Sequence, residues 1–338
     1  MIADRTDSPS TPSQGLKIGI DILAAETTMA GETPRWSDVL TLAETAEETG
    51  FDSIWIPDHF LLPTNFWTGE DQRITSIGNW ESWTILSALA LATKRVQLGT
   101  LVLGGGYRNP ALLAKMADTV DEISDGRLIL GIGSGWVEYE YRAFGYPHDH
   151  LVSRFEEAIQ IIHGLLKNGY VDFDGEYYQA HECELRPRGP RQGGPPIMIG
   201  SRRPRMHRLA ARYADIWNGS WSADVETLMP MLVAIDDACH QVGRDPQSLD
   251  LTAGVLVALP GNYPHRDRSP IWHQMLAGAH LTGSTEDIAA GLLAYQSRGV
   301  SHIQVLLDPM TPQGIEEFGR VLEIVHREGS PEEAVAAG

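Results

Sequence analysis

The sequence predicts an α/β protein with the architecture of a (β/α)8 TIM barrel that carries insertions at its C-terminal mouth. Three observations predict it: eight short β-branched runs, longer amphipathic segments between them, and no Gly-x-Gly-x-x-Gly turn after the first run. Strand and helix patterns in regular alternation are typical of parallel strands joined by helical crossovers. Eight such units favour a closed barrel, because an open doubly wound sheet usually has fewer strands and a Gly-rich turn after its first one.

The individual elements follow from local patterns. We expect strands over residues 16–22, 53–57, 96–103, 128–133, 196–200, 215–218, 249–259 and 302–307. Helices are expected over residues 37–49, 110–123, 150–167, 204–213, 225–242, 284–297 and 311–327, with Ser37 as a candidate cap of the first.

Three stretches are too long for simple connections: residues 60–80, 170–195 and 261–281. Loops of that length in a compact domain are usually functional or disordered. The first and third follow strand ends and are expected to be walls or lids of a site, whereas an Asp-Gly turn at 174–175 predicts a hairpin in the second.

Composition narrows the classes of partner. Of the 338 residues, 45 are acidic and 26 basic, and the net charge of −19 repels nucleic acids and anionic membranes. Cys183 and Cys239 have no metal or disulfide spacing, which fits a reducing cytoplasm. We expect a disordered tail over residues 1–14, one domain over residues 15–338, no membrane span, and a homodimer that acts on a small molecule.

The first chemical motif is the pair Asp58-His59 at the end of the second predicted strand. A carboxylate beside an imidazole can set the tautomer of the histidine and bring its pKa towards neutrality. The alternative is a structural cap and hydrogen bond, and the pair alone does not decide between them.

Two glycine-rich segments follow the next strands. Residues 95–110 run through a buried strand into three glycines and a proline-initiated helix, and residues 126–136 end in Gly-Ser-Gly-Trp. Glycines let a backbone approach a flat ring closely, and amides at such a turn suit carbonyl or phosphate acceptors. For residues 95–110 the alternative is a flexible loop. Residues 126–136 could be mistaken for a dinucleotide-binding fingerprint, but the acidic residue that such a fingerprint has about 20 positions further on, on the second strand of the βαβ unit, is absent.

A fourth segment, residues 195–205, predicts a phosphate site. A strand leads to Gly200, Ser201, Arg202 and Arg203 and then to a helix that starts at a proline. Free amides at a helix start attract anions, and guanidinium groups add paired donors. Arginines at a helix N-terminus oppose the helix dipole, so a solvated basic helix start is the weaker interpretation.

The histidines at 148 and 150 could share one metal ion only in an extended segment. They precede a predicted helix, no further Cys or His motif supports them, and capping by Asp149 explains the polarity. We therefore expect no metal.

Taken in order, these motifs resemble the luciferase-like monooxygenases. The resemblance runs from Leu16 to about Gly299 and is most specific in residues 51–60, 121–127, 133–136 and 212–218. It implies a flavin or deazaflavin at the C-terminal mouth, and a cis peptide or bulge near Leu101-Val102. It also implies contacts of the cofactor ring and ribityl chain with Asp58, Val102, Leu103, Ser134, Gly135 and Tyr139. The phosphate would be held by Gly200, Ser201, Arg202 and Arg203.

The resemblance leaves the cofactor open between the deazaflavin coenzyme F420 and FMN, which share one cleft. His59 matches the position that assists proton transfer in F420-dependent members, whereas flavin monooxygenases often carry Glu-His-His there. Sugar-phosphate dehydrogenases of the family carry a glutamate where this chain has Trp136, so that substrate class is not expected.

Three functions follow as hypotheses. The first is F420-dependent hydride transfer to or from a small organic substrate, with His59 as the catalytic acid or base. The second is an FMN-dependent monooxygenase that uses reduced flavin and oxygen. The third is a flavin-binding barrel without turnover, which would need neither the Asp58-His59 pair nor lid-length loops.

Overall fold

The computed structural model describes residues 15–28, 32–63, 76–222, 224–261, 263, 276, 278 and 280–329. The predicted tail over residues 1–14 lies outside them. The described residues form two compact units: those within 1–55, 218–234 and 250–338 make unit 1, and those within 56–217 and 235–249 make unit 2. One domain over residues 15–338 stays a prediction.

The main sheet closes on itself and confirms the predicted (β/α)8 barrel. Its hydrogen-bonded order is β10-β11-β12-β13-β1-β2-β5-β7, and β7 pairs back onto β10. All eight predicted strands are present. They are β1 (Lys17–Asp21), β2 (Ser53–Ile56), β5 (Gln97–Thr100), β7 (Leu128–Gly133), β10 (Ile197–Gly200), β11 (Ile216–Trp221), β12 (Asp250–Ala258) and β13 (Val300–Asp308). The short strand β6 (Leu103–Gly104) adds to β7.

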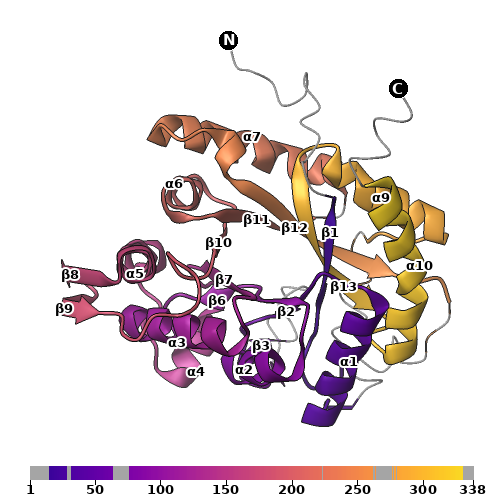
Figure 1. Ribbon diagram of the computed structural model, residues 1–338, viewed down its shortest axis with the longest axis horizontal. Coiled ribbons are helices and arrows are strands. Elements are labelled where there is room, and N and C mark those ends of the chain that lie inside the picture. The colour runs from indigo at the N-terminus through magenta and orange to yellow at the C-terminus, as the bar shows by residue number, and fades with distance from the viewer. Residues whose placement is uncertain are drawn as a thin grey trace. The chain divides into compact units, whose positions relative to one another are not determined.

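In unit 1, strands β12, β13 and β1 lie side by side. The pairing of β12 with β13 runs from Leu251 opposite Val300 to Ala258 opposite Asp308. Helices α1 (Trp36–Thr49), α9 (Thr285–Gln296) and α10 (Pro312–Glu328) pack beside one another against this part of the sheet (Figure 1). Phe51 and Phe318 stack with ring centroids 5.4 Å apart. Both rings are buried, and the burial of apolar side chains is the dominant stabilising contribution in such a packing.

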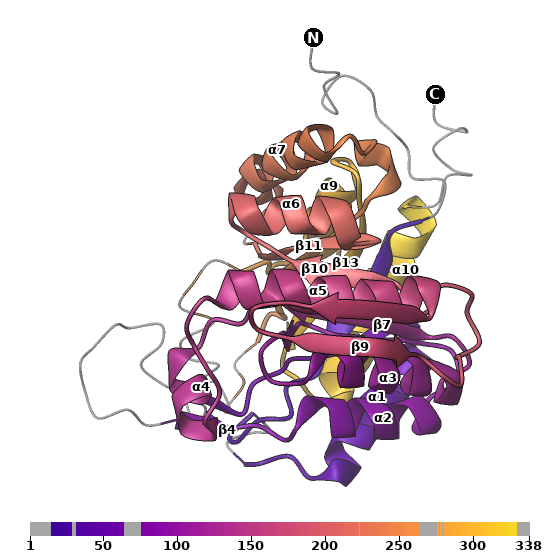
Figure 2. The same ribbon diagram turned by 90° about the vertical axis from the view of Figure 1, so that its left-hand side faces the viewer.

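The helices of unit 2 are α2 (Ser82–Ala92), α3 (Pro110–Ile123), α4 (Glu138–Phe144), α5 (Leu151–Asn168) and α6 (Pro204–Tyr213). The predicted hairpin is confirmed as β8 (Tyr170–Asp174) and β9 (Gln179–Glu184), and it lies against α5 (Figure 2). A second antiparallel pair, β3 (Leu61–Pro63) with β4 (Ser76–Gly78), begins just after His59. Helix α7 (Val225–Val242) and the short turn η1 (Pro246–Ser248) complete the described elements.

The cap and the lids predicted from the sequence have different outcomes. Ser37 does not cap α1: the N-cap is Arg35, whose backbone N–H donates to the Asp38 carboxylate at 2.7 Å. Of the expected lids, residues 64–75 and most of 262–279 lie outside the described residues. No helix in the described part of the chain is long and apolar enough to cross a bilayer.

Candidate functional site

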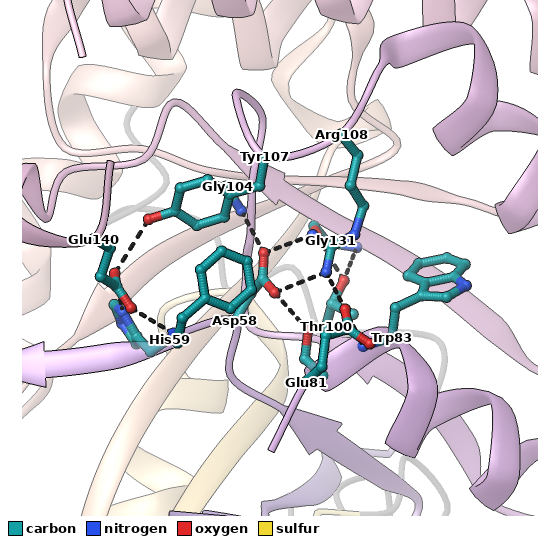
Figure 3. A network of polar contacts seen from close by, with 12 residues as sticks. Asp58, His59, Glu81, Trp83, Thr100, Gly104, Tyr107, Arg108, Gly131 and Glu140 are labelled. Carbon is teal, nitrogen blue, oxygen red and sulfur yellow. Dashed lines mark hydrogen bonds and ion pairs between the residues drawn. The ribbon is translucent and has the colours of Figure 1, made fainter. Parts of the chain in front are cut away.

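Asp58 follows β2 and is fully occupied by hydrogen-bond donors. Its Oδ1 accepts from the Ser82 hydroxyl at 2.6 Å, and its Oδ2 accepts from the Gly104 amide at 3.0 Å. Arg108 adds a bidentate pair at 2.8 and 3.0 Å (Figure 3). The carboxylate is 0% exposed, so its charge is stabilised by these four donors rather than by water.

Arg108 extends this network to the start of α2. Its second nitrogen also donates to Glu81, the N-cap residue of α2, which accepts from the amides of Trp83 and Thr84. Burial alone would raise the pKa of Glu81, but hydrogen bonds from Thr84 and Arg108 lower it below its ordinary value. Burial would lower the pKa of Arg108, and the two carboxylates raise it instead. Both charges are therefore stable at neutral pH.

Glu140, on α4, is the centre of a second network in the same unit. Its Oε1 accepts from the backbone amides of Phe60 and Leu61, and its Oε2 accepts from Tyr107 Oη at 3.1 Å and His59 Nδ1 at 2.9 Å. The side chain is 0% exposed. All four partners can donate, so the carboxylate form of Glu140 fits this environment.

His59 is held by a hydrogen bond at one of its two ring nitrogens. Nδ1 donates to Glu140, whereas Nε2 makes no hydrogen bond to any described residue. The side chain is 23% exposed, and its ring meets that of Trp136 edge to face, with centroids 5.5 Å apart. A carboxylate on Nδ1 fixes the tautomer in which Nε2 can accept a proton.

The structure therefore corrects the expected pairing within Asp58-His59. The two side chains take part in different networks, and the carboxylate that orients the imidazole is Glu140, 81 residues away in sequence. Adjacent residues at a strand end point in different directions, which separates a neighbouring aspartate from the ring. Sequence reasoning missed Glu140, although a glutamate soon after Gly-Ser-Gly was a usable signal.

Burial raises the pKa of Tyr107, and the Glu140 carboxylate raises it further. Its ring packs against Phe60, Tyr141 and Tyr146, with centroids 4.7, 4.7 and 5.4 Å away. Tyr107 is therefore a neutral hydrogen-bond donor over the whole physiological range, and it helps to fix Glu140.

The glycines that end β7 and β10 leave room around Val102. A Cβ atom added to Gly133 would lie 3.0 Å from Val102 Cγ2, and one added to Gly200 would lie 3.3 Å from it. The Leu101–Val102 peptide is cis, as the resemblance implies. Val102 is half-buried, but Leu103 is completely buried, so only the first presents side-chain surface.

The Gly-Ser-Gly turn is shaped by a tyrosine. Gly135 has φ +77°, and a Cβ there would lie 1.8 Å from the Tyr141 hydroxyl, so only glycine fits. Tyr141 donates to the Ser134 carbonyl at 3.3 Å. Ser134 and Gly135 are half-buried. Tyr139 points its ring towards the Arg142 guanidinium, 5.7 Å away.

The expected phosphate loop lies between β10 and α6. Ser201 is buried and its hydroxyl accepts from Trp217 Nε1 at 2.8 Å. Arg202 and Arg203 are exposed, and no described residue pairs with either guanidinium. No side chain caps the first turn of α6, which begins at Pro204. These two guanidinium groups, without a partner in the described part of the chain and beside an uncapped helix start, are donors of the kind that bind phosphate.

No group of three or more His, Cys, Asp or Glu side chains in the described part of the chain could hold a metal ion. Cys183 and Cys239 are free thiols.

Known proteins are similar to this chain in sequence and in fold. The chain is 33% identical over 234 residues to a phthiodiolone/phenolphthiodiolone dimycocerosates ketoreductase from Mycobacterium kansasii, covering 66% of this chain and 62% of that one. It is 31% identical over 210 residues to a 5,10-methylenetetrahydromethanopterin reductase from Archaeoglobus fulgidus, covering 62% and 56%. The chain thus matches less than two thirds of the length of each relative.

The fold is similar to that of an F420-dependent secondary alcohol dehydrogenase solved with an F420–acetone adduct. That structure has a TM-score of 0.74 and 19% sequence identity, and the match covers 92% of this chain and 99% of that one. The model of the luciferase-like monooxygenase family matches residues 16–262. Because this match spans most of the sequence, the chain belongs to the luciferase-like monooxygenase family.

Proposed function

We propose that this protein is an oxidoreductase that transfers hydride between coenzyme F420 and a small organic substrate. The observation that carries the proposal is His59, whose Nδ1 is held by buried Glu140 while Nε2 is left without a partner among the described residues. That arrangement suits a group that gives a proton to a substrate or takes one from it. The two named relatives are both reductases, which favours hydride transfer over oxygenation.

The residues around Val102 and α6 fit such a cofactor. Gly133 and Gly200 keep the backbone close around Val102, where a side chain would otherwise fill the space. Arg202 and Arg203, both exposed and unpaired within the described residues, would hold the phosphate. When bound, the deazaflavin supplies or accepts the hydride.

The chain itself contributes position and proton transfer. Asp58 and Arg108 fix the segment after β2 to the segment after β6, because one carboxylate binds both the Gly104 amide and the guanidinium. Glu140 holds His59 so that Nε2 can give a proton to the substrate oxygen or take one from it. The direction of turnover decides which of these occurs.

Binding of purified protein to F420, FMN and riboflavin, each followed by fluorescence, tests the proposal. We expect F420 to bind and to be oxidised or reduced when substrate is added. Tight FMN binding without measurable F420 affinity would instead identify the flavin-dependent alternative. Binding of F420 with no turnover on any substrate would favour a carrier.

The phosphate loop has its own control. Replacing both Arg202 and Arg203 with alanine should weaken cofactor binding by about tenfold or more, since a charge-assisted hydrogen bond contributes about 1.5–3 kcal/mol. Arg212→Ala is the matched control, because Arg212 is an exposed arginine in the last turn of the same helix. Equal effects of the two changes would show that the phosphate lies elsewhere.

A further inference from the structure

Unit 1 contains a second group of buried polar side chains that the proposed mechanism does not use. Asp21, Asn218, Thr252 and Gln304 come from β1, β11, β12 and β13, and each is at most 2% exposed. These four residues are called the polar layer. Buried polar groups are normally fully hydrogen-bonded, so any that is not needs an explanation.

Strand register places Asp21 on the same face as the rest of the layer. Gly19 pairs with Gln304 on one side and with Ser53 on the other. A Cβ on Gly19 would lie 2.2 Å from Ser53 Oγ and 2.4 Å from Trp55 Nε1, so this face of β1 looks onto those side chains. Asp21 is two residues further along, which puts it on that face, at the carboxyl end of β1.

Hydrogen bonds connect three residues of the polar layer, but two of its polar atoms have no partner among the described residues. Asn218 Nδ2 donates to Thr252 Oγ1 at 3.0 Å and to Gln304 Oε1 at 2.9 Å. This contact orients the Gln304 amide, yet its Nε2 has no hydrogen-bond partner among the described residues, and neither has Asp21 Oδ1. The indole of Trp55 donates to Ser53 and is not available to Asp21.

The charge state of Asp21 follows from its surroundings. Burial raises its pKa well above the ordinary value, and no charged group among the described residues offsets this. The nearest histidine on β13 does not help, because burial lowers the pKa of His302 to about 4 and leaves it neutral. A neutral Asp21 presents an O–H donor, and the Gln304 amide presents N–H donors.

We propose that Asp21 and Gln304 form a binding subsite for an uncharged oxygen, the carbonyl of a ketone or the hydroxyl of a secondary alcohol. Two unsatisfied donors call for an acceptor, and a neutral ligand avoids a buried charge. Binding sites are mostly apolar with a few placed polar groups, and barrel active sites lie at the carboxyl ends of strands, where Asp21 ends β1.

Ligand-observed NMR on the cofactor-free full chain tests the subsite directly. The probes are acetone, cyclohexanone and 2-octanone with their alcohols, and isopropylammonium serves as the charged control. We expect at least one ketone or alcohol to bind. Asp21→Val should weaken it by about three- to tenfold, because one hydrogen bond contributes about 0.5–1.5 kcal/mol. Asp21→Asn keeps a donor of similar size and should restore most of the affinity.

Infrared difference spectra give a second readout that a merely structural residue would not produce. The carbonyl stretch of a protonated carboxyl should be present in the wild type, shift when the ketone binds, and be absent in Asp21→Asn. Three outcomes overturn the proposal: no ketone or alcohol binds, Asp21→Val binds as well as wild type because only a buried water fills the site, or isopropylammonium binds more tightly. None of these measurements needs F420, so failure of the subsite and failure of the proposed cofactor are separate results.

Discussion

Asp21 and Asp58 are both buried carboxyls at the ends of the paired strands β1 and β2, yet their surroundings are opposite. Asp58 receives four donors, including both arms of Arg108, whereas Asp21 Oδ1 receives none from the described residues. The first is a charge built into the fold, and the second is a polar group that the fold leaves incomplete. Complete networks stabilise a structure, and incomplete ones are typical of positions that bind something else.

In the Glu140 network, His59 Nε2 has no partner among the described residues, and loss of this side chain should have the largest effect. His59→Ala should lower turnover by about 10²- to 10⁴-fold, the range for a general acid–base residue. Cofactor affinity should fall far less, because we propose that Arg202 and Arg203 hold the phosphate. Steady-state rates and F420 titrations on the same variant measure both. A variant that keeps more than about a third of wild-type turnover would exclude the acid–base role, given that range.

Removing the Asp58 carboxylate should show how strongly a complete network depends on each charge. Asp58→Ala leaves Arg108 buried without its main partner, and breaking such a pair costs about 3–5 kcal/mol. Urea denaturation at neutral pH measures the free energy of unfolding. Arg108→Ala should be similarly destabilising, and a loss below about 1 kcal/mol in both variants would mean that the pair is solvated like a surface ion pair.

The sequence predicted the barrel well because each strand carries its own signal. All eight strands were found within a few residues, since buried parallel strands are continuous apolar runs between turn residues. Helix α2 was not predicted, because Ser82–Ala92 is apolar on most sides and has no clear amphipathic period.

The site could be predicted only in part, because its contacts join residues that are far apart in the sequence. Asp58 and His59 stand in a motif, but their partners Arg108 and Glu140 are 50 and 81 residues away, and no local pattern reports such a contact. Asp21 offered a weak signal, as a lone carboxyl in an apolar strand. Only strand register shows that it shares a face with Gln304.

A smaller effect is expected at Glu140, where the charge can be removed while the shape is kept. In Glu140→Gln, an amide oxygen facing Phe60 and Leu61 turns the N–H group towards His59 Nδ1. That nitrogen must then accept, which moves the ring proton to Nε2. Turnover should fall by about 10²-fold, the lower end of the acid–base range. Glu140→Asp keeps the charge and should retain more activity; equal losses in both variants would indicate a packing role only.

The pH dependence of stability contrasts the two aspartates. Because the folded pKa of Asp21 is raised, the folded state keeps this proton after the unfolded chain has lost it. The stability that Asp21 contributes is present below the unfolded pKa of about 3.9 and is lost as pH rises towards the folded pKa, by at most about 1.4 kcal/mol per pH unit. Asp21→Asn should therefore unfold at higher urea than wild type at pH 7, with the gap closing near pH 4. A variant less stable than wild type at pH 7 would show that Asp21 has a partner after all.

The smallest effect is expected where a complete network loses one of several donors. Ser82→Ala removes the hydroxyl that donates to Asp58 Oδ1, but Arg108 still contacts that oxygen at 3.0 Å. Because the charge keeps three donors, the free energy of unfolding should fall by only about 1 kcal/mol, the net contribution of one hydrogen bond. Urea denaturation measures this loss beside that of Asp58→Ala. If Ser82→Ala were as damaging as Asp58→Ala, the hydroxyl rather than the guanidinium would be the main partner of the carboxylate. A loss near 1 kcal/mol would instead show that Asp58 is held redundantly, which is the property that Asp21 lacks.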